Sequence, residues 1–426
     1  MNMFTRGIKL PTFKEISLSS PRFKKAPPPH EVVIHLKQHA GLHALPIVKA
    51  LEKVFCGTLI AVAQGDFSAN LHSSLSGTVT EVNSEWIKIE SNGKDEWEAS
   101  VGESKEWRGS SKDEIFHAIF SAGIVGLGGD GVPTALKIKT AQDGPTDTLI
   151  LNGCESDAYL TADYVLMLNQ PADVLYGAEL LLKVSGLRQC IIAIQDDKID
   201  VIELFLSKIR GLHFKNITVK KLPSKYPQGA ERELARAIFG KSFLRFERAP
   251  LILNVATAFA VYEAVRFKKP LVERVVTVTG QCVVEPQNLL VRIGTPAQDL
   301  IKICKGFLRD PNRVIFGGPM SGISISSLET PLTKLTRGLV ALADEYIEDG
   351  EEKACIRCGF CVEVCPESLL PETLIRVIRK GKARAARELD LARCIECGNC
   401  TYICPSKIPM SQILKEGKTM MQEALD

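Results

Sequence analysis

Residues 355–366 read Cys-Ile-Arg-Cys-Gly-Phe-Cys-Val-Glu-Val-Cys-Pro, and residues 394–405 repeat this pattern as Cys-Ile-Glu-Cys-Gly-Asn-Cys-Thr-Tyr-Ile-Cys-Pro. Bacterial ferredoxins have the same spacing, in which three thiolates of one tight turn bind one cubane and the fourth, before a proline, binds the other. The two motifs therefore predict two [4Fe–4S] clusters. By this crossing rule the first cluster is held by Cys355, Cys358, Cys361 and Cys404, and the second by Cys394, Cys397, Cys400 and Cys365.

Zinc sites and disulfides are the alternatives for paired cysteines of this kind. A four-cysteine zinc site requires neither a third Cys-x-x-Cys step nor a Cys-Pro pair, so the motifs favour iron–sulfur clusters over zinc. Disulfides belong to oxidising compartments, and nothing else in the sequence places the chain in one. The remaining cysteines are predicted not to be ligands: Cys56, Cys154, Cys190, Cys282 and Cys304.

Length and composition indicate a globular protein of several domains. The chain has 426 residues, and single cores stop growing beyond roughly 250–300 residues. Its 45% hydrophobic and 24% charged residues exclude a disordered or fibrous chain, and its net charge of +3 gives no argument for a nucleic-acid partner. No apolar run reaches the roughly 18 residues of a transmembrane helix, and the N-terminus lacks the apolar region of a signal peptide. We therefore expect a cytoplasmic protein that can still sit on a membrane through partner subunits.

Changes in pattern divide the chain into segments. Residues 1–30 are rich in Lys and Pro and predict an extended arm rather than a packed element. Residues 31–105 contain short alternating runs between glycines, which predict a small β-rich module. Residues 110–268 alternate strands with helices, which predicts an α/β domain whose mostly parallel sheet is covered on both faces. The expected strands are 147–152, 189–195, 217–222 and 249–254, and the expected helices are 114–122, 164–186 with a break at Pro171, 199–209 and 255–267.

The last third of the chain adds two further predicted domains. Residues 270–330 are β-rich with one helix and predict a compact α+β module. The acidic stretch 344–352 then links this module to the cysteine motifs. The domain that contains both motifs is expected to cover residues 345–426.

A glycine-rich turn lies at residues 126–133, which read Gly-Leu-Gly-Gly-Asp-Gly-Val-Pro. Four glycines in six residues allow positive φ angles and let a flat or phosphorylated ligand approach the backbone closely. The turn is neither a dinucleotide fingerprint nor a nucleoside-triphosphate loop. Taken alone it fits a ligand loop and a structural turn equally well, and Lys137 after it fits a phosphate contact and a solvated lysine equally well.

Further motifs follow the turn in a fixed order: Asn152-Gly-Cys-Glu155, Leu160-Thr-Ala-Asp163, Tyr226-Pro-Gln-Gly-Ala-Glu231 and Asn254-Val-Ala-Thr257. With the β-rich modules and the paired cysteine motifs, they make the chain resemble the C subunits of the Rnf electron-transport complex. The flavin fold of that family is shared with the flavin subunit of respiratory complex I. The resemblance implies an N-terminal barrel-sandwich-like module, a Rossmann-like α/β flavin domain, a β-grasp module of the soluble-ligand-binding (SLBB) type and a C-terminal α-helical domain of the double [4Fe–4S] ferredoxin type.

The same resemblance implies one pocket for FMN and the nicotinamide of NADH. By position, FMN would be surrounded by Gly126, Gly128, Gly129, Gly131, Lys137, Asn152, Glu155, Tyr226, Gly229, Asn254 and Thr257, with Asp157 and Glu231 toward the nucleotide side. The implied protein is a peripheral subunit on the cytoplasmic face of the cell membrane. It moves electrons from NADH through FMN and two clusters to other subunits of an ion-translocating complex, and indirectly to ferredoxin.

Three positions depart from the family pattern, and two other functions compete. A small residue is usual at Asp130, an aromatic at Val132 and Glu-Pro at Asp157-Ala158. A carboxylate at Asp130 disfavours a phosphate unless its side chain points outward, and loss of the aromatic weakens nicotinamide stacking. The competing functions are a soluble flavin and iron–sulfur reductase of the cobalamin-reductase type, and a cluster relay whose flavin pocket has decayed. The N-terminal module favours the Rnf type, because the cobalamin type begins near the glycine turn.

Overall fold

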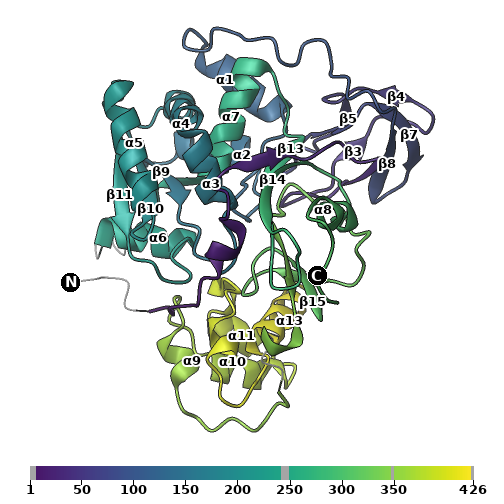
Figure 1. Cartoon of the computed structure of the whole chain (residues 1–426). Coiled ribbons are helices and arrows are strands. Elements are labelled where there is room, and N and C mark those ends of the chain that lie inside the picture. The colour runs from purple at the N-terminus through teal and green to yellow at the C-terminus, as the bar shows by residue number, and fades with distance from the viewer. Residues whose placement is uncertain (1–5, 241–248, 347–349, 424–426) are drawn as a thin grey trace.

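The computed structural model describes residues 6–240, 249–346 and 350–423 (Figure 1). The N-terminal module contains two small antiparallel sheets. One has the strand order β2 (Glu31–His35), β8 (Trp86–Ser91), β7 (Gly77–Val82) and β4 (Lys53–Val54). The other has the order β3 (Leu45–Pro46), β5 (Leu59–Val62) and β6 (Leu71–His72). Alternate side chains of β2 are buried and the intervening ones are partly exposed, as the apolar pattern of the sequence predicts.

The α/β domain has a four-stranded sheet in which every pair is parallel. Its strand order is β11 (Ile217–Leu222), β10 (Gln189–Gln195), β9 (Thr148–Gly153) and β12 (Leu251–Asn254). The helices are α1 (Lys112–Ser121), α2 (Thr134–Asp143), α3 (Ala162–Asn169), α4 (Pro171–Ser185), α5 (Ile199–Gly211), α6 (Glu231–Phe239) and α7 (Val255–Phe267). The predicted strands and helices of this domain are confirmed to within about two residues, and Pro171 begins a new helix because its ring suits the first turn.

Both faces of this sheet are covered by helices. Leu149 and Leu151 of β9 point into the large core that contains residues of α4 and α7. Ile150, between them, points to the opposite face and packs with Leu234 and Ala235 of α6. Successive strand residues face opposite sides, so the unbroken apolar run of β9 marks a strand that is buried on both faces.

A six-stranded mixed sheet follows. Its order is β1 (Phe23–Lys25), β14 (Gln287–Arg292), β13 (Glu273–Thr279), β17 (Gly338–Leu342), β15 (Arg313–Phe316) and β16 (Ile323–Ile325), with α8 (Ala297–Ile303) beside it. Strand β17 lies between β13 and β15, so the sheet of this module extends beyond the boundary predicted at residue 330.

The prediction of an unpacked N-terminal arm was wrong. The arm forms a short 3₁₀ helix, η1 (Lys14–Ser17), and then the strand β1, which pairs in parallel with β14. Before them, the ring of Phe13 stacks on Tyr159, with ring centroids 4.9 Å apart. The arm is rich in Lys and Pro, but its few apolar residues pack against the edge of the six-stranded sheet and against the α/β domain.

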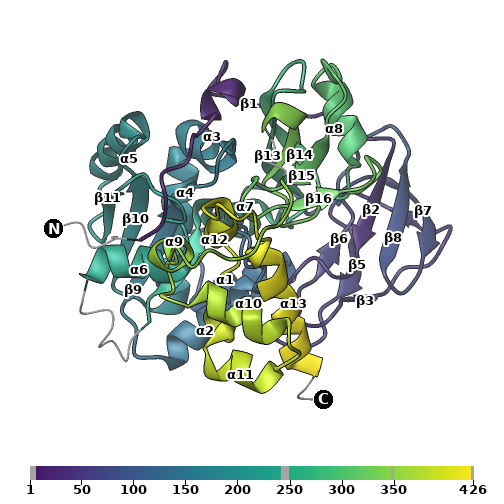
Figure 2. The same ribbon diagram turned by 90° about the horizontal axis from the view of Figure 1, so that it is seen from below.

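The cysteine motifs lie in a separate helical lobe (Figures 1 and 2). A short 3₁₀ helix, η3 (Asp344–Tyr346), precedes it. The lobe contains α9 (Phe360–Glu363), α10 (Pro371–Ile378), α11 (Ala383–Glu388), η4 (Leu391–Arg393), α12 (Asn399–Tyr402) and α13 (Met410–Glu423). It has its own hydrophobic core, in which Leu374, Leu391 and Leu414 are buried. No helix in the described part of the chain is long and apolar enough to cross a membrane.

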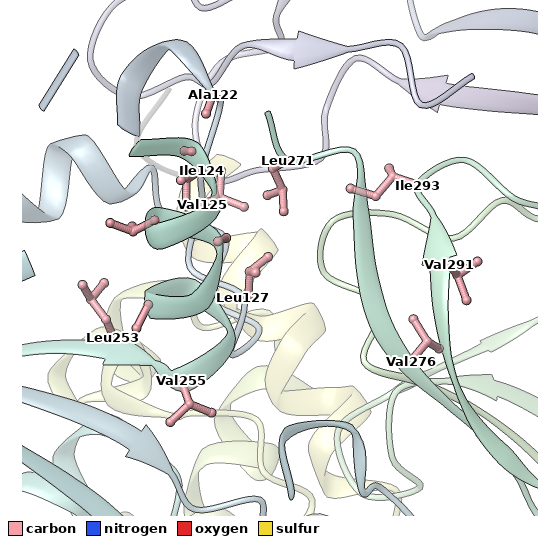
Figure 3. Close-up of a cluster of buried hydrophobic side chains, with 14 of the residues drawn as sticks. Ala122, Ile124, Val125, Leu127, Leu253, Val255, Leu271, Val276, Val291 and Ile293 are labelled. Carbon is pink, nitrogen blue, oxygen red and sulfur yellow. The ribbon is translucent and has the colours of Figure 1, made fainter. Parts of the chain in front are cut away.

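The three preceding modules share one hydrophobic core instead (Figure 3). Ala122, Ile124, Val125, Leu127, Leu253 and Val255 of the α/β domain lie in the same cluster as Leu271, Val276, Val291 and Ile293 on the side of the six-stranded sheet. Side chains of the N-terminal module, such as Ile60 and Ile87, belong to it as well. These modules therefore form one packed body, to which the cluster lobe is attached.

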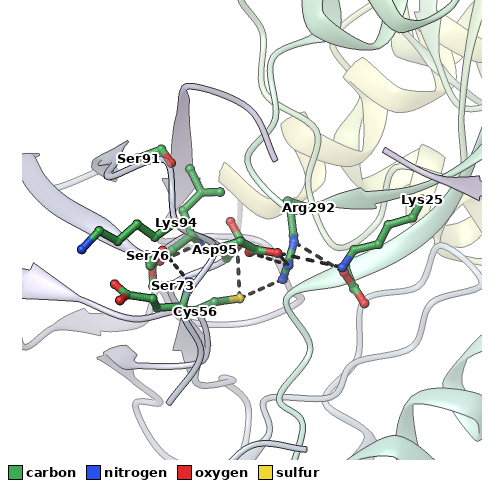
Figure 4. A network of polar contacts seen from close by, with 12 residues as sticks. Lys25, Cys56, Ser73, Ser76, Ser91, Lys94, Asp95 and Arg292 are labelled. Carbon is green, nitrogen blue, oxygen red and sulfur yellow. Dashed lines mark hydrogen bonds and ion pairs between the residues drawn. The ribbon is translucent and has the colours of Figure 1, made fainter. Parts of the chain in front are cut away.

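Arg292 joins the N-terminal module to the six-stranded sheet (Figure 4). Its side chain is 2% exposed and donates two hydrogen bonds to Asp95, at 2.8 and 3.0 Å, and one to the sulfur of Cys56 at 2.8 Å. It also lies over the ring of Trp97, 4.5 Å from the centroid. Burial raises the pKa of Cys56 to about 12, so this thiol stays protonated and acts as a structural contact.

Replacing Arg292 with Ala should destabilise the protein by about 3–5 kcal/mol, because it removes the hydrogen bonds to Asp95 and Cys56 and the cation beside the buried Glu273 carboxylate. Arg309, whose ion pair with Glu345 is on the surface, is the matched control. Its replacement with Ala should leave the urea midpoint close to that of the wild type, because solvent screens an exposed ion pair. Urea unfolding of both variants measures the difference, and equal losses would show that the Arg292 network is not a main tie between the modules.

Candidate functional site

A pocket of about 620 Å³ lies where the α/β domain, the six-stranded sheet and the cluster lobe meet. Its floor is formed by the ends of β9 and β12, at Asn152 and Asn254, together with the glycine turn. Ligands of parallel α/β sheets bind outside the carboxyl ends of the strands, which is where this pocket opens. Its volume is within the usual range for a bound cofactor, about 300–1,000 Å³.

Nine of the predicted flavin-site residues line this pocket, and four do not. The nine are Gly126, Gly128, Gly129, Asn152, Asp157, Tyr226, Gly229, Glu231 and Asn254. The four that lie behind its walls are Gly131, Lys137, Glu155 and Thr257. The structure thus brings together segments that are far apart in the sequence, and the role of each residue as a ligand contact stays a prediction.

Three of the four residues behind the walls hold the pocket in shape. The Thr257 hydroxyl accepts a hydrogen bond from the Leu127 N–H at 3.0 Å and so ties the glycine turn to α7. The buried Glu155 carboxylate accepts the N–H groups of Asp163, at 3.0 Å, and of Tyr164, at 3.3 Å, at the start of α3. The Gly131 carbonyl accepts the N–H of Ala40. These contacts position the backbone that a ligand would meet.

Two glycines show why the lining must lack side chains. Gly129 has a φ of +117°, a conformation that is strained for other residues, and the space where its Cβ would stand is open. A Cβ on Gly229 would lie 2.5 Å from the carbonyl oxygen of Cys154. The turn and the opposite wall therefore both present bare backbone to the pocket, which lets a ligand approach the main chain closely.

Buried carboxyl groups lie on the other side of the pocket. Asp163 accepts a hydrogen bond from the Asn254 amide at 2.7 Å, and burial, with the charge of Glu155, raises its pKa to about 6. Asp157 is also buried, and burial raises its pKa. Its Oδ2 accepts a hydrogen bond from Ser321 at 2.9 Å, whereas its Oδ1 has no partner among the described residues. An unpaired buried acceptor in a pocket wall fits a ligand that donates an N–H or O–H there, so the lining suits a flavin.

Several lining residues were not among those predicted from the sequence. Gly317, Ser321 and Arg337 come from the six-stranded sheet and its β15–β16 connection. The glycines at 317, 318 and 322 were the available signal, because such a density of glycine often marks a close approach to a ligand. Lys14 of the arm, which is not part of the lining but contacts the Glu155 segment behind it, was missed because the arm was predicted to be unpacked. Its partly buried ammonium group donates to the Glu155 carbonyl, and desolvation, with the charge of Lys198, lowers its pKa to about 8.

The eight motif cysteines form two groups in the cluster lobe. Cys355, Cys358, Cys361 and Cys404 line one hollow, and Cys365, Cys394, Cys397 and Cys400 line another. This is the grouping that the crossing rule predicts, in which the last cysteine of each motif joins the first three cysteines of the other motif. Among the described residues, no three His, Cys, Asp or Glu side chains converge closely enough to hold a single ion. The hollow at the first quartet has a volume of about 330 Å³, and the hollow at the second quartet is much smaller, at about 20 Å³.

The second quartet adjoins the pocket, and the first lies at the surface. Cys397 and Ile395 are part of the pocket lining, and the Tyr226 hydroxyl donates a hydrogen bond to the Cys397 carbonyl at 2.8 Å. Cys355 and Cys358 of the first quartet are exposed. The three sites are therefore arranged in the order pocket, second quartet, first quartet, surface.

The N-terminal arm adds a clamp between the pocket and the second quartet. Arg6 donates to the Cys365 carbonyl at 3.3 Å, and the N–H of Gly7 donates to the Val364 carbonyl at 3.2 Å. The next residue, Ile8, exchanges two backbone hydrogen bonds of 2.9 Å with Tyr226. The arm thus joins the turn of Cys365 to the residue that contacts Cys397.

Family models match four parts of the chain. They are the RnfC barrel sandwich hybrid domain at residues 2–96, the Nuo51 FMN-binding domain at 119–263, the SLBB domain at 275–324 and the 4Fe-4S dicluster domain at 354–408. These descriptions agree with the fold class and with the cofactors that the sequence predicts.

Curated relatives cover nearly the whole chain. The C subunit of the proton-translocating ferredoxin:NAD(+) oxidoreductase complex of Clostridium ljungdahlii is 35% identical over 91% of this chain and 87% of its own. The C subunit of the ion-translocating oxidoreductase complex of Rhodobacter capsulatus is 35% identical over 98% of this chain and 83% of its own. A solved NAD+-reducing [NiFe]-hydrogenase in the air-oxidised state shares the fold with a TM-score of 0.54, at 18% identity, over 74% of this chain and 63% of that one.

Replacing Cys365 with Ser should remove the second cluster, not the cluster of its own motif, and Cys404→Ser should remove the first. Iron should fall from eight to about four atoms per chain in each variant. The EPR spectrum of the remaining reduced cluster should match Cys397→Ser in the first case and Cys358→Ser in the second. A match of Cys365→Ser with Cys358→Ser would show that the motifs do not cross.

Proposed function

Because the chain belongs to the family of RnfC proteins, the C subunits of ion-translocating oxidoreductase complexes, we propose that it is the NADH-oxidising, electron-transferring subunit of a membrane complex of the Rnf type. In such a protein FMN supplies the chemistry, since it accepts a hydride and releases single electrons to iron–sulfur clusters. The protein has to hold the flavin, admit the nicotinamide and keep the clusters in line.

The observation that carries this proposal is the shared wall between the pocket and the second quartet. Cys397 faces the pocket from one side and belongs to the quartet on the other, and no further cofactor is needed between them. A pocket of ordinary globular function has no reason to include a ligand of an iron–sulfur cluster in its lining. We therefore assign the second cluster as the first acceptor of electrons from the flavin, and the first cluster as the next.

The chain's own residues would bind and orient the flavin from three directions. The Asn152 amide donates to the Gly229 carbonyl at 2.8 Å and accepts the Cys154 N–H at 3.0 Å, so it fixes two walls relative to each other. The bare backbone of the glycine turn would let the ligand approach the main chain closely. The unpaired Oδ1 of Asp157 is the acceptor that we assign to a donor group of the flavin or the nicotinamide.

Electrons would leave the protein at the exposed first quartet. Ile356 and Phe360, beside its cysteines, are 68% and 46% exposed. Exposed large apolar residues next to a redox site suit a contact with another protein. We propose that other subunits of the complex dock here, that ferredoxin exchanges electrons through them, and that the chain is bound peripherally on the cytoplasmic face of the cell membrane.

The two competing functions have less support. A soluble reductase of the cobalamin type would not need the N-terminal module, which matches the RnfC barrel sandwich hybrid domain. A relay without flavin would not need an open pocket beside Cys397. The Rnf-type function accounts for both features.

Anaerobically purified protein should contain one noncovalent FMN per chain, and NADH should reduce it. The reason is that the pocket combines a glycine turn, an unpaired acceptor and a neighbouring cluster. Absorbance spectra before and after addition of NADH measure both properties, with NADPH as the control nucleotide. Protein that carries both clusters but binds no flavin after reconstitution with FMN would favour the relay function.

The order of the clusters predicts different behaviour in the two cysteine variants. NADH should rapidly reduce both the flavin and the remaining cluster of Cys404→Ser, because that cluster is next to the pocket. In Cys365→Ser, NADH should still reduce the flavin, but the remaining cluster should be reduced at least tenfold more slowly than the remaining cluster of Cys404→Ser. Dithionite should reduce the remaining cluster fully in both variants, which controls for damage. Equal rates of cluster reduction by NADH would contradict the proposed order.

A further inference from the structure

Lys137 of α2 lies between two carboxylates beside the pocket. Its Nζ donates to Asp130 Oδ2, to Glu231 Oε1 at 2.7 Å and to the Ile252 carbonyl at 3.2 Å. An ammonium group has three N–H donors, so all of them are used. Burial by itself would lower the pKa of Lys137, but the charges of Glu231 and Asp130 raise it, and the group stays positive.

Asp130 does not point away from the glycine turn. Its Oδ1 accepts the Val132 N–H at 3.1 Å, and its carboxylate folds back over Gly126. A Cβ on Gly126 would lie 1.7 Å from this oxygen, so the carboxylate occupies the space that the glycine leaves free. Asp130 also belongs to the pocket lining. An acidic residue here would be compatible with a phosphate only if its side chain pointed outward. The Asp130 side chain does not point outward.

The charges at this end of the pocket do not favour a phosphate. Two carboxylates and one ammonium group leave the cluster of Asp130, Lys137 and Glu231 with a net charge of −1 when all three are ionised. The neighbouring cation of the lining, Arg232, is already paired with Glu367 at 2.8 Å. A phosphate at the glycine turn would meet a lysine whose donors are already used, and a carboxylate of like charge beside it. An unphosphorylated ribityl chain carries no charge and is not repelled.

We infer that Asp130 sets the flavin specificity of this pocket, because by holding Lys137 it removes most of the advantage that FMN would have over riboflavin. The inference rests on the proposed function, since it presupposes that a flavin binds here. It concerns only the phosphate end of the ligand. The isoalloxazine ring is common to both flavins and therefore cancels in the comparison.

An ion pair made by another lysine of α2 provides the control. Lys139, two residues after Lys137, forms an ion pair with Asp66 at 2.7 Å, and both side chains are at least half exposed. Removing Asp66 therefore deletes a carboxylate partner of an α2 lysine without changing the pocket.

The experiment measures the dissociation constants of FMN and riboflavin by calorimetry. It uses the full chain with its clusters, after removal of bound flavin, and compares wild type, Asp130→Ala and Asp66→Ala. Asp130→Ala should bind FMN about tenfold more tightly, equivalent to about 1.4 kcal/mol, with riboflavin unchanged. Asp66→Ala should change neither constant. In the Asp130→Ala background, Lys137→Gln should weaken FMN binding more than it does in the wild type, because only there is the lysine free for the phosphate.

The outcomes separate this inference from the proposed function. If both flavins bind and Asp130→Ala leaves the ratio of their dissociation constants unchanged, the inference is wrong while the proposed function stands. The same conclusion follows if Asp130→Ala tightens both flavins equally, since that would be an effect of pocket shape. If neither flavin binds any of the proteins, the proposed function fails and the inference fails with it.

Discussion

The hydrogen bond from the Tyr226 hydroxyl to the Cys397 carbonyl joins two bodies that have separate hydrophobic cores. Because the two cores are separate, the distance from the pocket to the second quartet depends on polar contacts of this kind. Arg232 adds an ion pair with the buried Glu367 at 2.8 Å, and the arm adds its backbone clamp at Gly7 and Ile8. Hydrogen bonds are directional, and a set of them fixes a relative position more sharply than a sliding apolar contact would.

The pocket itself is held from behind by buried cations. Lys334 is 1% exposed, and its ammonium donates to the carbonyls of Asn70, at 2.8 Å, and Gly123, at 2.7 Å. Arg274, also buried, donates to the carbonyl of Leu127 in the glycine turn. Burial lowers the pKa of Lys334 to about 7 and that of Arg274 to about 10, because the protein interior disfavours their charged forms. Together with the Ala40 N–H, which donates to the Gly131 carbonyl, the Arg274 contact anchors the glycine turn to the N-terminal module and to the six-stranded sheet at once.

This anchoring explains how a flexible sequence can form a fixed site. Glycines give the turn its conformational freedom, and the contacts of Thr257, Arg274 and Ala40 remove that freedom in the folded protein. The same logic applies to Lys137, whose side chain would be mobile without its two carboxylate partners. The pocket is preorganised by residues that mostly do not face it.

The sequence by itself determined the local structure and the partition of the cysteines. Apolar periodicity placed the strands and helices of the α/β domain, and the spacing of the motifs predicted which cysteines group together, because both depend on residues close in the chain. The tertiary structure decided which predicted residues line the pocket and which support it, as with Glu155 and Thr257. It also placed Ser321, Arg337 and Cys397 in the pocket lining, and it placed Asp130 against Lys137. The pairs that matter here, such as Lys137 with Glu231 and Tyr226 with Cys397, are 94 and 171 residues apart. Their contacts are set by the packing of whole modules, which no local pattern encodes.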